Sequence, residues 1–218
     1  TPKPTRGGTR FTYITNSFFK DLYSWDSLVN PSRIISLVKP LVTDQMNEDL
    51  CKPFSEQEIS DALFQIGPLK APGPDGFTFE FLRACWPIIK EDIMLAFNQF
   101  YNLAGNNFGL LNSAIVALIP KKDGANGIND YRPISLIHSI AKLVSKVLSI
   151  RLAPVVQHII SPAQRTFLKT RCLHDSFVYV QNCVKALHRK KTPAVLLKLD
   201  ISRAFDNVSW EYLLELMV

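Results

Sequence analysis

The carboxylate best placed for chemistry lies in the stretch AVLLKLDISRAFDNVSW, residues 194–210. The apolar run at residues 194–197, with Leu199 after it, is typical of a buried strand that ends on Asp200. Open sheets place catalytic and binding residues at the carboxyl ends of their strands, so Asp200 is a candidate for such a role. The alternative is that Asp200 only forms the turn at the strand end, which is the commoner role of a single aspartate.

Basic residues form a second candidate site at the ends of two further predicted strands. Lys121 and Lys122 follow the apolar run at residues 114–119, which predicts a buried strand, and Arg132 opens a predicted returning strand at residues 131–136. A hairpin brings these side chains to one end, where lysine and arginine can bind phosphate groups. The alternative is a solvated hairpin tip without a ligand.

A third candidate site comes from the distribution of charge along a chain whose net charge is +6. Residues 141–191 hold ten lysines and arginines against one acid, Asp175, which gives this segment a net charge of +9. Such a segment predicts a surface that binds nucleic-acid phosphates, with Arg165, Lys169 and Arg171 as candidate contacts. The alternative is a solvated helical face, and charge alone does not decide between the two.

Helices dominate the elements that must position these residues. Ser55 and Glu58 have the spacing of a capping box, and apolar residues then recur at helical spacing until Gly67 and Pro68 end the helix. Similar stripes and caps predict further helices at about residues 16–25, 77–85, 87–104, 139–151 and 174–189 and from Trp210 onward, where Ser209 can cap.

Two details of these helices and the count of elements complete the structural prediction. Pro154 is expected to bend or end the helix that begins at Ser139. The helix at residues 174–189 is expected to face inward with its apolar stripe, Phe177, Val180, Val184 and Leu187. With about three strands against at least five helices, the predicted fold class is α+β, helix-rich with a small antiparallel sheet.

Composition limits the class of protein. The chain of 218 residues, 47% of them hydrophobic, is one large domain or part of a bigger one, and no apolar run approaches the ~18 residues of a membrane span. Residues 1–10 are polar and basic without the apolar stretch of a secretion signal, so we expect a location in the nucleus or cytoplasm. The cysteines and histidines lack metal-site spacing, and the missing initiator methionine predicts a piece of a longer protein.

Four blocks of the sequence, in this order, resemble the reverse transcriptases of non-LTR (LINE-type) retrotransposons, of a plant-like kind. They are KAPGPDG at residues 70–76, IPKKD and NDYRPISLI between residues 119 and 137, SPAQRTF at residues 161–167, and LDISRAFD at residues 199–206. Four blocks in the order and spacing of the family are a far more specific signal than any one of them. The sequence departs from the family at Thr170, where glycine is usual before Arg171, and this affects local geometry more than identity.

The resemblance covers about residues 54–218 and implies a partial right-hand polymerase, the fingers and the beginning of the palm. Residues 1–53 are then an N-terminal extension or a linker to an upstream region. The implied activity is RNA-directed DNA synthesis, with an RNA template, a DNA primer and deoxynucleoside triphosphates (dNTPs) as partners, and no membrane. The later palm and the thumb would be supplied by the same polyprotein.

The resemblance also implies roles for the candidate residues. Asp200 is implied as a catalytic residue that binds Mg²⁺, together with the backbone carbonyl of Ile201, in a site for two ions. Arg132 and either Lys121 or Lys122 are implied contacts of the dNTP triphosphate, and the choice between the two lysines stays open.

The last two implications concern nucleotide choice and activity. Phe205 is implied as a ring beneath the sugar of the incoming nucleotide, and the alternative is that this ring only packs the palm.

No pair of adjacent aspartates, which the family uses as further metal ligands, occurs in these 218 residues, so we expect weak or absent Mg²⁺ binding and no polymerase activity by the chain alone. The alternative function is a non-catalytic, nucleic-acid-binding remnant of a retroelement. A phosphatase with an Asp-x-Asp motif is disfavoured, because Ser202 stands at its second acidic position.

Overall fold

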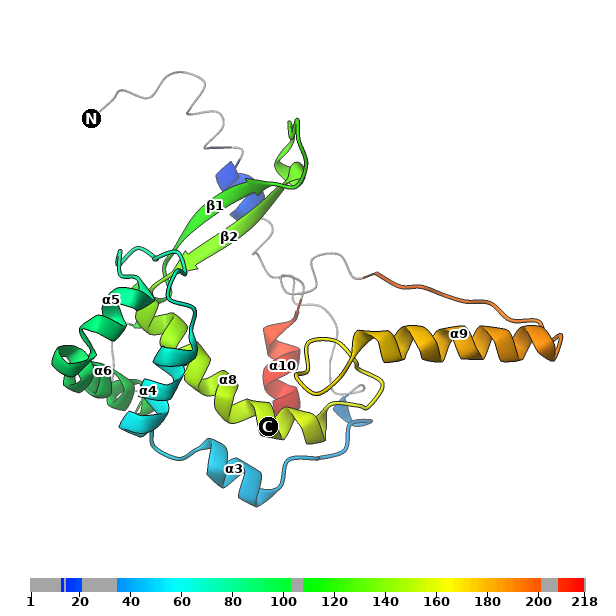
Figure 1. The fold of residues 1–218 in the computed structure, drawn as a ribbon, viewed down its shortest axis with the longest axis horizontal. Helices are drawn as coiled ribbons and strands as arrows, with labels where there is room; N and C mark the ends of the chain where they lie inside the picture. The colour runs from blue at the N-terminus through cyan, green and yellow to red at the C-terminus, as the bar shows by residue number, and fades with distance from the viewer. Residues whose placement is uncertain (1–12, 14, 21–34, 103–107, 201–207, 218) are drawn as a thin grey trace. The chain divides into compact units, whose positions relative to one another are not determined.

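The computed structural model describes residues 13, 15–20, 35–102, 108–200 and 208–217 (Figure 1). The chain divides into two compact units, residues 41–164 and residues 1–40 with 165–218, which we take separately. Among the described residues helices outnumber strands, and the strands form one two-stranded antiparallel sheet, so the predicted helix-rich class with a small antiparallel sheet is confirmed. None of the described helices has the length and apolar character needed to cross a bilayer.

Helix α4 (Glu56–Gln65) is central to the unit at residues 41–164, and its ends follow the sequence signals. The Ser55 hydroxyl accepts a hydrogen bond from the Glu58 backbone amide at 3.2 Å, which satisfies one of the free N–H groups of the first turn. The last intrahelical bond comes from the backbone amide of Ile66, immediately before Gly67. Three residues of the predicted stripe have no exposed surface: Ile59, Ala62 and Leu63.

Helix α5 (Phe79–Ala84) is tied to the end of α4 by one side chain. Arg83 donates hydrogen bonds to the backbone carbonyls of Phe64 at 2.9 Å, Leu63 at 3.3 Å and Ile66. These carbonyls lie at the end of α4, where no further helical amide can bond to them. Arg83 therefore takes the place of a C-terminal cap.

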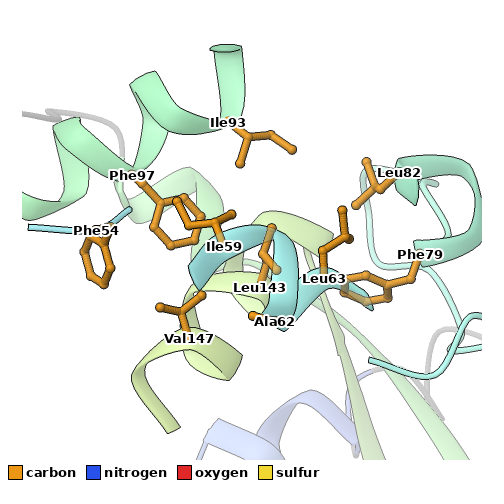
Figure 2. Close-up of a cluster of buried hydrophobic side chains, with 10 residues drawn as sticks. All are labelled: Phe54, Ile59, Ala62, Leu63, Phe79, Leu82, Ile93, Phe97, Leu143 and Val147. Carbon is orange, nitrogen blue, oxygen red and sulfur yellow. The ribbon is translucent and has the colours of Figure 1, made fainter. Parts of the chain in front are cut away.

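The hydrophobic core of this unit lies where α4, α5, α6 (Trp86–Tyr101) and α8 (Ser139–Ile159) meet (Figure 2). Its buried side chains are Phe54, Ile59, Ala62, Leu63, Phe79, Leu82, Ile93, Phe97, Leu143 and Val147. The rings of Phe54 and Phe97 meet edge to face with their centroids 5.2 Å apart. Complete burial of a side chain of this size stabilises a fold by about 1.5–3 kcal/mol, so this cluster is the main source of stability in the unit.

The unit also contains two short helices. Helix α3 (Asp44–Leu50) is capped by the Thr43 hydroxyl, which accepts a hydrogen bond from the Met46 amide at 3.3 Å. Helix α7 (Phe108–Leu111) comes before the hairpin. Pro87 lies at the start of α6, as predicted, because a first-turn position needs no amide donor.

The sheet is a hairpin of β1 (Ala114–Pro120) and β2 (Tyr131–Ile137), which pair antiparallel from Ala114 opposite Ile137 to Pro120 opposite Tyr131. Both strands are where the sequence predicts them. The prediction that residues 114–119 form a buried strand is wrong, because Ile115 is 52% exposed and most of β1 is exposed with it. A two-stranded sheet buries its faces only against a second layer, and no helix of the unit at residues 41–164 covers this sheet along its length.

Helix α8 does not end at Pro154, where the sequence predicts that it bends or ends. Pro154 lies inside the helix, which runs on to Ile159. A proline removes one backbone donor and crowds the preceding turn, but it leaves the later hydrogen bonds intact. Val155 is buried, and the Ile160 amide bonds to the Val156 carbonyl, so the last turn remains anchored.

The described part of the second unit holds α9 (Leu173–Arg189) and α10 (Trp210–Met217). The Ser209 hydroxyl accepts a hydrogen bond from the Tyr212 amide at 3.2 Å, so the predicted cap of α10 is confirmed. The predicted inward stripe of α9 is wrong for this structure, because its four residues are exposed: Phe177, Val180, Val184 and Leu187. Nothing in the described part of this unit packs over them deeply enough to bury them.

The segment before Asp200 also differs from its prediction. Residues 192–200 form no helix or strand, and the apolar side chains of Val195 and Leu197 are exposed. The expected buried strand at residues 194–200 is therefore wrong for this structure. The physical reason is that a strand needs a neighbour for its backbone hydrogen bonds, and no described strand pairs with this segment.

Candidate nucleotide-binding site

The basic residues of the hairpin gather at the end where the chain reverses. The register places Ile119 opposite Arg132 and Pro120 opposite Tyr131, so the lysines at 121 and 122 leave β1 directly beside the start of β2. The backbone amide of Lys121 donates to the Asp130 carbonyl at 2.8 Å and extends the pairing by one step. The register thus places residues 121, 122 and 132 at one end of the hairpin, while the convergence of their side chains on a nucleotide stays a prediction.

The turn between the strands is organised around one carboxylate. Asp130 ends the short 3-10 helix Ile128–Asp130, and its Oδ2 accepts hydrogen bonds from the backbone amides of Gly127 at 3.1 Å and Asn126 at 3.3 Å. The hydrogen bond from Lys122, followed by that from the Gly127 amide, lowers the pKa of this carboxyl below its usual value of 3.8. Asp130 is therefore ionised at neutral pH and holds the loop in one shape.

The two lysines of the turn differ in the charge of their partners. Lys122 Nζ lies 2.8 Å from Asp130 Oδ1, so a negative group already balances its charge. Lys121 Nζ donates to the backbone carbonyl of Asn129 at 2.7 Å, a neutral partner, and no carboxylate among the described residues pairs with it. Arg132 is exposed on β2. The hairpin end therefore presents the charges of Lys121 and Arg132 more than that of Lys122.

The KAPGPDG turn contains a contact that spacing does not reveal. Asp75 Oδ2 accepts hydrogen bonds from both the backbone amide and the hydroxyl of Ser139, at 2.6 and 2.5 Å. Ser139 is the first residue of α8, and it is 64 positions away from Asp75 in the sequence. The sequence predicts a rigid turn at Asp75 but gives no signal for its partner, because a single long-range polar contact has no periodicity.

The basic residues of segment 141–191 do not form one described surface. Two of those on α8 hold the helix in place, since Lys142 donates to the Ala71 carbonyl at 2.8 Å and Arg151 forms an ion pair with Glu58. Arg151 is not available to a surface ligand, because its side chain is 11% exposed and its guanidinium also binds the backbone carbonyls of residues 50, 52 and 53.

The other candidate contacts for nucleic acid lie in the second unit, so the boundary between the units crosses the segment. Arg165, Lys169 and Arg171 fall within the turns at residues 161–172 that precede α9. Arg165 Nη1 lies 3.9 Å from Asp175 Oδ2, at the edge of ion-pair distance. Lys169 is exposed. Their contact with nucleic acid stays a prediction.

Asp200 lies at the end of the exposed segment 192–200. Ile201 and Phe205 lie outside the described residues, so the implied carbonyl ligand and the implied gate are not located. Among the residues that the structure describes, no three metal-binding side chains come together. A two-ion Mg²⁺ site needs several oxygen ligands, and Asp200 alone supplies one carboxylate, so the described residues do not form such a site by themselves.

Comparison with known proteins gives one family match that includes both the basic end of the hairpin and Asp200. Residues 119–217 match the family described as reverse transcriptase (RNA-dependent DNA polymerase). This matched segment contains the basic end of the hairpin, the turns at residues 161–172 and Asp200, but not the KAPGPDG turn.

Longer relatives extend the similarity to most of the chain. The "Transposon TX1 uncharacterized 149 kDa protein" of Xenopus laevis is 30% identical over 200 residues, which cover 91% of this chain and 15% of that protein. The "Retrovirus-related Pol polyprotein from type-1 retrotransposable element R1" of Bradysia coprophila is 26% identical, over 90% of this chain and 18% of its own length. The "Retrovirus-related Pol polyprotein from type-2 retrotransposable element R2DM" of Drosophila melanogaster is 27% identical, over 76% of this chain and 15% of its own length.

The chain thus spans less than a fifth of the length of each of these relatives. The plant-like origin and the boundary between residues 53 and 54 are not tested by these matches and stay predictions. The family match, the four sequence blocks and the similarity along most of the chain agree. Residues 119–217 are therefore part of a reverse transcriptase domain, and the chain is similar along most of its length to proteins of non-LTR retrotransposons.

Proposed function

We propose that this chain is the nucleotide-binding and template-binding part of an RNA-directed DNA polymerase encoded by a retrotransposon. In this proposal residues 54–218 are the fingers and the beginning of the palm of a right-hand polymerase, and residues 1–53 are an extension or linker. The observation that carries it is the basic end of the β1–β2 hairpin, which lies within the segment that matches the reverse transcriptase family.

Lys121 and Arg132 are the proposed contacts of the dNTP triphosphate. A triphosphate is strongly anionic and favours cations whose charge is not already balanced. Lys121 donates to a neutral carbonyl, whereas Lys122 is paired with Asp130. We therefore propose that Lys122 holds the turn and that Lys121 contacts the nucleotide, a choice between two lysines that the sequence leaves equivalent.

Asp200 is the proposed metal ligand and catalytic carboxylate, with the Ile201 carbonyl beside it, but only as part of a larger site. One carboxylate does not balance the charge of two divalent ions, so the remaining acidic ligands must come from other parts of the longer protein. We expect the 218-residue chain to bind Mg²⁺ weakly and to be inactive alone. Phe205 remains the proposed gate beneath the sugar.

The RNA template and the DNA primer are the proposed partners of the turns that precede α9. Arg165, Lys169 and Arg171 would contact backbone phosphates, because such contacts give affinity without sequence preference. A non-catalytic remnant that keeps only this binding is the second candidate function, and the exposed basic residues of segment 165–191 favour it if polymerisation is absent.

Primer extension tests the proposal. The complete retrotransposon protein that contains this chain should extend a DNA primer on an RNA template with Mg²⁺, and Asp200→Asn should abolish extension. Lys121→Ala should raise the KM for dNTP by about tenfold, the loss of one charge-assisted contact, and Lys122→Ala should raise it less. Extension by the isolated 218-residue chain, or equal effects of the two lysine variants, would contradict these assignments. Binding of RNA without extension by the complete protein would favour the remnant.

A further inference from the structure

The hairpin joins the rest of its unit through a very short connection. β2 ends at Ile137 and α8 begins at Ser139, so only His138 lies between them. Figure 1 shows the hairpin extending away from this end of α8. Its faces stay open, with Ile134 40% exposed and Ile115 52% exposed, so lateral packing does not fix its direction. Where β2 runs into α8, the direction of the hairpin therefore depends on the backbone at residues 137–139.

The KAPGPDG turn holds this connection through Asp75. His138 is the residue at the cap position of α8, but its side chain makes no capping hydrogen bond. Asp75 supplies the missing acceptor from 64 positions away, through its two bonds to the amide and hydroxyl of Ser139. A carboxylate at a helix N-terminus is stabilised both by the free amide and by the helix dipole.

The backbone of the same turn packs tightly against the connection between β2 and α8. A Cβ atom added to Gly73 would lie 2.0 Å from the Ile137 carbonyl oxygen and 2.8 Å from the His138 amide nitrogen. Both atoms belong to the backbone and cannot move aside as a side chain would. Lys142, one turn into α8, adds a hydrogen bond to the Ala71 carbonyl at 2.8 Å. The turn therefore contacts both the end of β2 and the start of α8.

The Asp75 side chain is largely buried and remains ionised. Burial raises the pKa of this carboxyl, but the hydroxyl and amide of Ser139, the amide of Phe77 and nearby His138 lower it by more, so it lies below 3.8. His138 Nδ1 lies 3.8 Å from Asp75 Oδ2, and its Nε2 lies 3.0 Å from the Ser113 hydroxyl. The residue types resemble a hydrolase triad, but 3.8 Å is too long for the hydrogen bond between aspartate and histidine that such a triad needs.

We propose that Asp75 is a positioning residue that fixes the direction of the β1–β2 hairpin and thereby places Lys121 and Arg132. At about 3.3 Å per residue, the strand from His138 back to Arg132 spans about 20 Å, so a tilt of about 10° at its base moves the basic end by about 3.5 Å. A misplacement of even 1 Å can cost about a hundredfold in catalysis. The link to the nucleotide rests on the proposed function, but the positioning itself does not.

The positioning is tested first in the 218-residue chain. Spin labels on cysteines introduced at Asp123 in the hairpin turn and at Asp92 on α6, with the native cysteines replaced by serine, report the distance between the hairpin and the core by double electron–electron resonance. The parent chain should give one narrow distance distribution, and Asp75→Ala and Asp75→Asn should broaden or shift it. Ser139→Ala removes one of the two bonds and should have a smaller effect of the same kind.

The control is Asp44→Asn, which removes an exposed carboxylate from the first turn of another helix, α3, without touching the connection. It should leave the distribution unchanged. Unchanged distributions in both Asp75 variants, with helical circular dichroism intact, would overturn the proposal. If the Asp75→Ala variant loses its helical circular dichroism, the other two variants decide whether the proposal holds. Asp75→Asn preserves the volume of the side chain, and Ser139→Ala preserves one of the two hydrogen bonds.

The consequence for the nucleotide is tested in the complete protein. Asp75→Asn should raise the KM for dNTP at least about tenfold with a smaller change in kcat and no change in affinity for primer–template, since only the hairpin end moves. Absence of primer extension by the unmodified complete protein would overturn the proposed function, while the distance measurement would still decide the positioning. A broadened distance with an unchanged KM would overturn the link between the two.

Discussion

The two units differ in how far they bury an amphipathic helix. In the unit at residues 41–164, the apolar stripe of α4 is buried, and Phe97 on α6 has no exposed surface. In the described part of the other unit, α9 has an equally clear stripe, yet Phe177 on it is 68% exposed. An amphipathic pattern therefore predicts that a helix has a face to bury, but it does not say where the partner for that face comes from.

The exposed stripe of α9 is part of a larger apolar surface. A cavity of about 510 Å³ lies between α9 and the segment at residues 192–196, and its lining includes Val180, Val184, Val195 and Leu196. Apolar surface of this extent usually marks a place where another segment or protein binds. Since the relatives are several times longer than this chain, we expect a further segment of the same polyprotein to cover it.

Matched phenylalanine substitutions give the largest expected effect and test whether the two units differ as described. Phe97→Ala should lower the free energy of unfolding by about 3–5 kcal/mol, because it leaves a cavity in the core. Phe177→Ala should change it by about 0.5 kcal/mol or less, because this ring is already in solvent. Urea denaturation followed by circular dichroism measures both. Similar losses in the two variants would show that α9 is buried in solution.

Two ion pairs within the unit at residues 41–164 give a second comparison between a buried and an exposed position. The Arg151 guanidinium donates to both carboxylate oxygens of Glu58 and lies 4.3 Å from the centroid of the Phe54 ring. Arg151→Met should cost about 2–3 kcal/mol, because it leaves a largely buried carboxylate without its partner.

The matched control is Lys90→Met, which removes the exposed ion pair with Glu56 and should cost less than about 1 kcal/mol. Thermal or urea denaturation of the two variants provides the comparison. An equally small effect of Arg151→Met would mean that solvent reaches the Glu58 carboxylate. The Arg151→Met substitution also removes the main polar connection between α8 and the residues before α4, the hydrogen bonds to the carbonyls of residues 50, 52 and 53.

Nucleic-acid binding gives the smallest expected effect and compares the basic residues of the two units. The triple variant with Arg165, Lys169 and Arg171 replaced by alanine should reduce the slope of log affinity against log salt by about 2 for single-stranded RNA. Lys142→Ala with Lys146→Ala should reduce it by less than about 1, because Lys142 already bonds to Ala71. Filter binding over a range of salt measures both slopes. A flat salt dependence of the parent chain would contradict the predicted surface.

Local signals in the sequence predict the elements of this structure well. The caps at Ser55 and Ser209 act within three residues, and the hairpin requires only two apolar runs and a turn. For the same reason the shared position of Lys121, Lys122 and Arg132 is predictable. The physical interactions that decide these features are short-range, so the sequence displays them directly.

Contacts between distant parts of the chain are not predictable in this way. Asp75 reaches Ser139 across 64 positions, and Glu58 reaches Arg151 across 93. Single polar contacts have no period, and the spacing of Asp75 predicts only a turn. Burial of α9 and pairing of residues 194–200 fail as predictions for a related reason, because both need a partner surface that no described residue provides.

The uncovered segment before Asp200 has a consequence for how such a protein is made. Four consecutive apolar residues, 194–197, lie open to solvent with unpaired backbone groups, and only Pro193 and Lys198 interrupt the run on either side. Segments of this composition pair edge to edge with other copies when they stay exposed, and flanking proline and lysine residues slow that pairing. If the expected covering segment is synthesised later in a longer protein, these residues stay exposed on the ribosome until it emerges, and nascent chains then aggregate more readily.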